Sequence, residues 1–182
     1  MKNNLVKAAV YGLAAGIICS TVIISIILAK IGLDDYSFKK WVGKSSTENL
    51  IILNRDCPDQ KNSRYVCMFA AVKAKRSEPL FTEGISTCCA LALDNEKEGT
   101  HYLAHFAAVN DWEEVRDSIT NNFLDTNGLV VYVIAGDMAN SKMQAIKNVY
   151  KALKGLNLAN NAKYCQSDAV LIKEGELYNA NF

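Results

Sequence analysis

A stretch without a single charged residue, Ala8–Ala29, divides the chain into two parts of different character. It lies between Lys7 and Lys30, and its 22 residues exceed the roughly 20 that an α-helix needs to cross a hydrocarbon core. We therefore predict an N-terminal transmembrane helix, or uncleaved signal anchor, within residues 1–30. A cleaved secretory signal is the alternative, but its apolar core usually has about 7–15 residues, fewer than this stretch has.

The lysines around this stretch indicate its orientation. Lys and Arg are enriched on the cytoplasmic side of a membrane span, and those within about 15–20 residues of its ends determine its orientation. Before the stretch lie Lys2 and Lys7, and after it lie Lys30, Lys39, Lys40 and Lys44. The small excess favours a single-pass membrane protein whose C-terminal domain is cytoplasmic, and secretion after signal cleavage is the alternative.

The remainder of the chain has the length and charge of one globular domain. Polar residues 31–48 predict a linker, which leaves 49–182 as the domain, within the usual range of about 100–150 residues. The net charge of the whole chain is +1, so no excess of basic residues indicates a nucleic-acid partner. Four N or S ligands at known zinc spacings are also missing, so we expect no metal.

Apolar periodicity predicts both helices and strands in this domain. Hydrophobic residues recur on one helical face after Asn110, which looks like a helix cap, and again over Ala139–Leu156. The apolar runs that predict strands are Leu50–Leu53, Tyr65–Val72, Cys88–Leu93, Tyr102–Val109, Leu129–Ala135 and a hairpin of 168–173 with 176–181. The expected fold is α+β (mixed α/β), with a β-sandwich-like core of mixed sheets flanked by two main helices.

The central segment Phe81–Val109 holds the residues that could carry chemistry. It contains the adjacent cysteines Cys88 and Cys89 and both histidines of the chain, His101 and His105. Its two apolar runs are joined by a polar segment that ends in glycine, which is typical of paired strands. Such pairing would bring a cysteine beside a histidine, and an imidazole base raises the fraction of reactive thiolate. Cysteines and histidines on apolar runs are, however, more often core residues.

The segment resembles the active-site region of the CheD-type glutamine deamidases, which share a catalytic core with the cytotoxic necrotizing factor toxins and the Burkholderia lethal factor. Thr82 precedes Cys88 by six residues and His105 follows it by 17, and both intervals fit the family pattern. Ser86-Thr87-Cys88 stands where the family usually has Gly-Ser-Cys, and Tyr102-Leu103-Ala104-His105 stands at its histidine strand. Cys89, in place of an aliphatic residue, departs from the pattern.

Three later segments continue the resemblance, so that it covers roughly residues 65 to 180. Val131–Gly136 resembles the family's apolar strand that ends in Ala-Gly, Lys147–Leu153 its following helix, and Val170–Leu177 its terminal hairpin. The Pro that often follows the family's histidine strand is missing here.

This resemblance implies that the chain is a protein-glutamine deamidase, for example a bacterial effector or toxin. Its partner would be a protein substrate that bears a reactive glutamine, and it would need no cofactor. Cys88 would be the nucleophile, His105 its base, and Thr82 the residue that bonds the imidazole or positions the substrate amide. Backbone N–H groups around Cys88 and Cys89 could stabilise the oxyanion. Transglutamination is possible if an amine replaces water.

Two other classes of protein stay open at this stage. One is an inactive, membrane-anchored binding domain of the same fold, and the other is a cysteine amidase or protease of different specificity. Strand alternation directs Cys88 and Cys89 to opposite faces and places Cys89 in the core. We expect His101 to be an exposed strand-end residue, since connections run over the surface. Cys57 and Cys67 would form a disulfide only in an oxidising compartment.

Overall fold

The computed structural model describes residues 23–41, 62–136 and 144–180. The chain separates into two compact units, Met1–Lys40 and Trp41–Phe182. In the first unit the described residues are helical throughout, and the helix ends at residue 41. Residues 31–41 of the predicted linker are therefore helical, whereas 42–48 lie outside the described residues.

The predicted transmembrane stretch Ala8–Ala29 lies mostly outside the described residues, since only 23–29 are included. None of the helices in residues 23–41, 62–136 and 144–180 is both long and apolar enough to cross a membrane.

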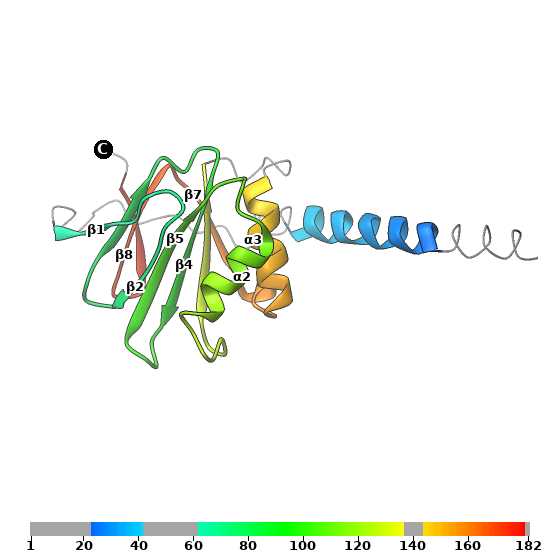
Figure 1. Ribbon diagram of the computed structural model, residues 1–182. Coiled ribbons are helices and arrows are strands. Elements are labelled where there is room, and N and C mark those ends of the chain that lie inside the picture. Colours follow the sequence, from blue (N-terminus) through cyan, green and yellow to red (C-terminus); the bar gives the residue numbers. More distant parts are fainter. Residues whose placement is uncertain (1–22, 42–61, 137–143, 181–182) are drawn as a thin grey trace, which may run out of the picture. The chain divides into compact units, whose positions relative to one another are not determined.

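The second unit is built on two β-sheets (Figure 1). The five-stranded sheet has the order β2-β5-β4-β6-β7, with the bounds Ala71–Lys75, Thr100–Phe106, Cys89–Asn95, Val130–Ala135 and Lys163–Gln166. The four-stranded sheet has the order β1-β3-β8-β9, with the bounds Arg64–Tyr65, Leu80–Glu83, Ala169–Lys173 and Glu176–Asn179. Each sheet contains one parallel pair, β6 with β7 and β1 with β3, so both sheets are mixed.

The two sheets share a hydrophobic core, and two helices complete the domain. Side chains from both sheets, among them Leu80, Ala90, Leu103 and Ile172, belong to one buried cluster. The helices α2 (Trp112–Thr120) and α3 (Gln144–Gly155) pack together on the outer face of the five-stranded sheet (Figure 1). The prediction of an α+β fold with two mixed sheets and two flanking helices is confirmed for this unit.

The strands at the centre of the sheet follow the apolar runs closely. Every residue of β4 is buried, because β5 and β6 pair with its two edges while the second sheet and the helices cover its faces. The predicted 168–173 and 176–181 hairpin is also confirmed as β8 and β9. The helix α2 begins one residue later than predicted, because the side chain of Asp111, not that of Asn110, accepts a hydrogen bond from the Glu114 N–H.

The predicted single strand Tyr65–Val72 is wrong. The chain leaves β1 after Tyr65, makes a turn and enters β2 at Ala71, so that it passes from one sheet to the other. The turn contains Phe69 at φ 68°, a left-handed conformation that an aromatic residue rarely adopts. The strands β3 and β7 were not predicted, and the predicted strand Leu50–Leu53 lies outside the described residues.

Candidate active site

Thr82 and His105, two of the three predicted site residues, are in direct contact. Thr82 belongs to β3 of the four-stranded sheet, and His105 belongs to β5 of the five-stranded sheet. Both side chains are buried where the sheets face each other, and Thr82 Oγ1 lies 2.8 Å from His105 Nδ1. The residues are 23 positions apart, so the contact depends on how the two sheets pack.

Cys88 lies immediately before β4, in the neighbourhood of this pair. Ala90 of β4 is directly opposite His105, and Cys88 stands two positions before Ala90, in the bend that leads into the strand. The Cys88 Sγ contacts Met68 Sδ at 3.7 Å. Met68 is also next to Phe69, whose N–H donates to the His105 carbonyl oxygen at 2.9 Å. The segment Met68–Phe69 thus contacts both Cys88 and the histidine strand.

The thiol and the imidazole are not hydrogen-bonded to each other. Within the described part of the chain, His105 Nε2 is buried and has no hydrogen-bond partner. Hydrogen bonds between catalytic groups are often long or unmade until substrate binds. Because Nε2 has no hydrogen-bond partner, it can accept a proton from the thiol.

The protonation of His105 follows from its surroundings. Burial lowers the pKa of the imidazole below its ordinary value, because a low-dielectric interior disfavours the charged form. A neutral imidazole at pH 7 can act as a general base. If Nδ1 carries the proton and donates it to Thr82 Oγ1, the lone pair is on Nε2.

The turn that carries Cys88 is held by backbone contacts from two other segments. The Ile85 N–H donates to the Asp168 carbonyl at 3.1 Å. Gly136 approaches so closely that a Cβ at this position would lie 2.5 Å from Ser86 Cα. The Cys88 N–H donates to the Ile85 carbonyl at 2.8 Å, so it is already engaged and is a poor candidate for an oxyanion donor. Ser86 and Thr87 are exposed in the same turn.

Cys88 and Cys89 are both buried, but Cys88 keeps 5% of its surface exposed, whereas Cys89 has none. Burial raises the pKa of the Cys89 thiol, an effect to which Cys165 and Cys88 add. Such a thiol is a poor nucleophile at neutral pH. The prediction that Cys89 lies in the core is confirmed. Cys67 is exposed and its thiol is free, while its suggested disulfide partner Cys57 lies outside the described residues.

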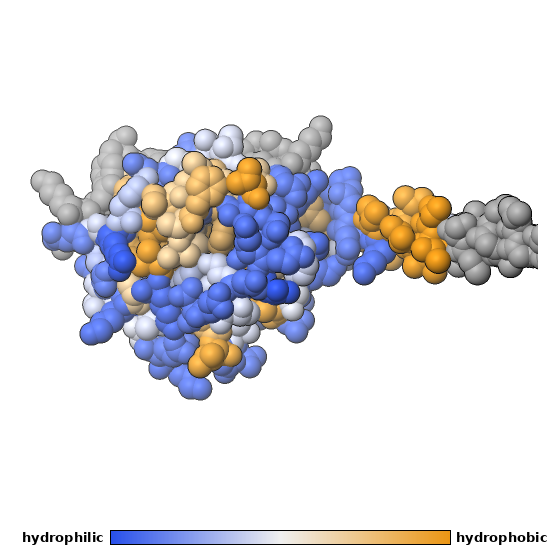
Figure 2. Space-filling view, in the orientation of Figure 1, coloured by the Kyte–Doolittle hydropathy of each residue, from blue (hydrophilic) through white to orange (hydrophobic). Residues whose placement is uncertain are grey.

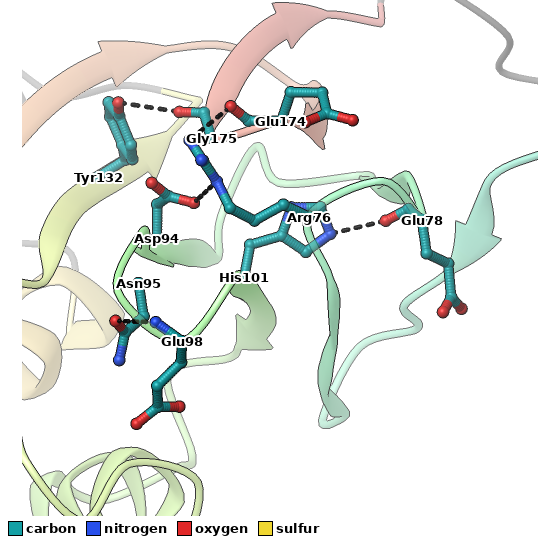
Figure 3. Close-up of polar contacts among 9 residues, drawn as sticks. All are labelled: Arg76, Glu78, Asp94, Asn95, Glu98, His101, Tyr132, Glu174 and Gly175. Atoms are coloured by element: carbon teal, nitrogen blue, oxygen red, sulfur yellow. Dashed lines mark hydrogen bonds and ion pairs between the residues drawn. The ribbon is translucent and has the colours of Figure 1, made fainter.

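The prediction that His101 is exposed is wrong. The residue is fully buried, and its Nε2–H donates to the Glu78 carbonyl at 2.6 Å (Figure 3). It lies opposite Asp94, at the end of the β4–β5 ladder remote from Cys89. Asp94 in turn forms an ion pair with Arg76, whose guanidinium also donates to the Glu174 carbonyl. The β2–β3 turn thus contacts His101 through Glu78, and through Arg76 it also contacts Asp94 and the β8–β9 turn.

Met68 was missed as a member of the site. It lay within a predicted strand, and nothing in its sequence position distinguished it from an ordinary apolar strand residue. Among the described residues, no group of three or more His, Cys, Asp and Glu side chains is placed to hold a metal ion.

The two buried histidines predict a pH-dependent stability. Burial lowers the pKa of both His101 and His105 below the ordinary value of 6.5. As the pH falls below about 6.5, the unfolded chain binds protons that the folded chain does not, so the free energy of unfolding decreases. Urea unfolding should therefore show lower stability at pH 5.5 than at pH 7.5. A His101→Gln, His105→Gln variant should lose most of this difference, and an unchanged difference would contradict the assignment.

Comparison with known proteins does not assign the chain to a family. A scan against protein-family models finds no match, and a search of curated proteins finds no significant match.

Proposed function

We propose that this protein is a cysteine-dependent protein-glutamine deamidase, with Cys88 as nucleophile and His105 as general base. The main support is the hydrogen bond between Thr82 and His105, which links two sheets at positions that the resemblance to the CheD-type deamidases singles out. The position of Cys88 one residue before β4, two positions from Ala90 that lies opposite His105, supports the same proposal.

The reaction follows from the chemistry of these groups. His105 Nε2 takes the thiol proton, and the Cys88 thiolate attacks the carboxamide carbon of a substrate glutamine. The C–N bond then breaks, and the imidazolium returns the proton to the departing nitrogen, which leaves as ammonia. Water, activated by His105, hydrolyses the thioester to give glutamate and the free thiol. The balance is one amide and one water converted into one carboxylic acid and one ammonia. Thr82 acts as a positioning residue that fixes the imidazole ring.

One observation favours a different reading, an inactive binding domain of the same fold. The Cys88 Sγ contacts Met68 rather than the imidazole, as a packed and unreactive cysteine would. The two readings differ in the reactivity of the thiol. A catalytic Cys88 is alkylated rapidly by iodoacetamide near pH 7, whereas a packed one is not.

The test of the proposed function compares the two adjacent cysteines. The full-length chain should convert glutamine to glutamate on its substrate, which mass spectrometry of candidate proteins detects as a gain of about one dalton per site. Cys88→Ser should reduce this conversion by a factor of about 10³ or more, because the nucleophile is lost. Cys89→Ala should retain it and lower the free energy of unfolding by about 1 kcal/mol. Equal loss of activity in a folded Cys89→Ala variant would reverse the assignment.

We also propose that Ala8–Ala29 anchors the protein in a membrane, with the domain on the cytoplasmic side. The support is the uncharged 22-residue stretch and the lysines around it. The full chain should sediment with membranes and resist extraction by carbonate, and a variant without residues 1–31 should not. Release of the full chain by carbonate would contradict the proposal.

A further inference from the structure

The loop between β1 and β2 places two large apolar side chains at the surface beside Cys88. Met68 and Phe69 are 47% and 57% exposed, whereas the other described phenylalanines of the domain, Phe81, Phe106 and Phe123, are buried. Met68 contacts the Cys88 Sγ, and the Phe69 N–H bonds the His105 strand. Figure 2 shows an apolar area on the face of the domain that is in view.

The backbone holds Phe69 in this position against its intrinsic preference. A left-handed conformation costs a bulky residue free energy, and such outliers cluster at functional sites. Hydrogen bonds from the Phe69 N–H to His105 and from the Ala70 N–H to Cys67 maintain the turn. The ring consequently faces solvent, although burial would stabilise it.

We infer that Met68 and Phe69 determine substrate specificity by binding an apolar side chain next to the reacting glutamine. This inference rests on the proposed function, because the two side chains matter for specificity only if Cys88 reacts. Met68 is 47% exposed and its Sδ lies 3.7 Å from the Cys88 Sγ, so it is an exposed apolar group in contact with the thiol that the substrate has to reach. Phe69, the next residue along the chain, adds a second exposed apolar side chain. The substrate class is therefore a protein segment in which a large apolar residue adjoins the glutamine.

The experiment measures binding separately from catalysis. Two fluorescein-labelled peptides of Gly and Ser carry a central glutamine and differ only in the two residues that adjoin it, both Leu in one peptide and both Ser in the other. Their dissociation constants are measured by fluorescence anisotropy with the full-length Cys88→Ser chain, which cannot turn them over. The Leu peptide should bind about tenfold more tightly, because it buries one large apolar side chain.

The decisive variant is Phe69→Gly in the same background. Glycine suits a positive φ, so this change removes the ring while the turn is retained. The preference for the Leu peptide should fall to less than about threefold with no loss of melting temperature. Leu124→Ser is the matched control, since Leu124 is fully exposed in the segment that follows α2 and should not affect the preference.

The outcomes separate this inference from the proposed function. If neither peptide binds, if both bind equally, or if Phe69→Gly retains the preference, the inference is wrong. If the preference is present and depends on Phe69 but no protein is deamidated, the proposed function fails while the binding surface stands. If a protein is deamidated but the Leu peptide is not preferred, the proposed function stands and the inference about Met68 and Phe69 is wrong.

Discussion

Replacing His105 with alanine is expected to lower the rate of glutamine deamidation by about 10²–10⁴-fold, the usual contribution of a general base. The change should also slow the alkylation of Cys88 by iodoacetamide near pH 7, because the thiol loses the group that accepts its proton. Ammonia release and the alkylation rate, measured on the same preparations, provide the two readouts. A structural role alone would not predict the slower alkylation.

The other histidine supplies the control. His101→Ala should leave both rates nearly unchanged, because its side chain bonds the Glu78 carbonyl at the far end of the β4–β5 ladder. It should nevertheless destabilise the domain, since it creates a cavity and removes a buried hydrogen bond. If a folded His101→Ala variant loses activity while His105→Ala retains it, the assignment of His105 as the general base is wrong.

The second large effect is expected at the ion pair between Asp94 and Arg76. The Asp94 side chain is 6% exposed and that of Arg76 is 26% exposed, and the Arg76 Nε lies 2.9 Å from Asp94 Oδ1. Asp94→Ala leaves the partly buried guanidinium without its counter-charge (Figure 3). We expect the free energy of unfolding to fall by about 3 kcal/mol, the lower end for a broken buried pair, because Arg76 keeps some contact with solvent.

A surface ion pair is the matched control for this change. Asp117 contacts Arg116 at 2.7 Å, but both side chains are exposed. Asp117→Ala should therefore change the free energy of unfolding by no more than about 0.5 kcal/mol. Urea unfolding of both variants at one pH provides the comparison. Equal losses in the two variants would show that the Asp94 pair contributes no more than a surface contact.

The elements that could be predicted from the sequence are those with strong local signals. The apolar run of β4, the hairpin of β8 and β9 around Glu174-Gly175 and the two amphipathic helices follow from periodicity and turn residues, which act over a few positions. The spacing of Thr82, Cys88 and His105 identified a candidate site by resemblance. Strand alternation, also a local property, was sufficient to place Cys89 in the core.

The contacts between distant segments were decided by the tertiary structure alone. The bond between Thr82 and His105 requires that β3 and β5, in different sheets, pack face to face. His101 follows a glycine-ended connection and looked exposed, but it is buried and bonds the Glu78 carbonyl of the turn after Lys75. Phe69 in its left-handed turn is stabilised by a bond to the His105 strand. Local propensity cannot predict such features, because the interactions that stabilise them come from residues far away in the sequence.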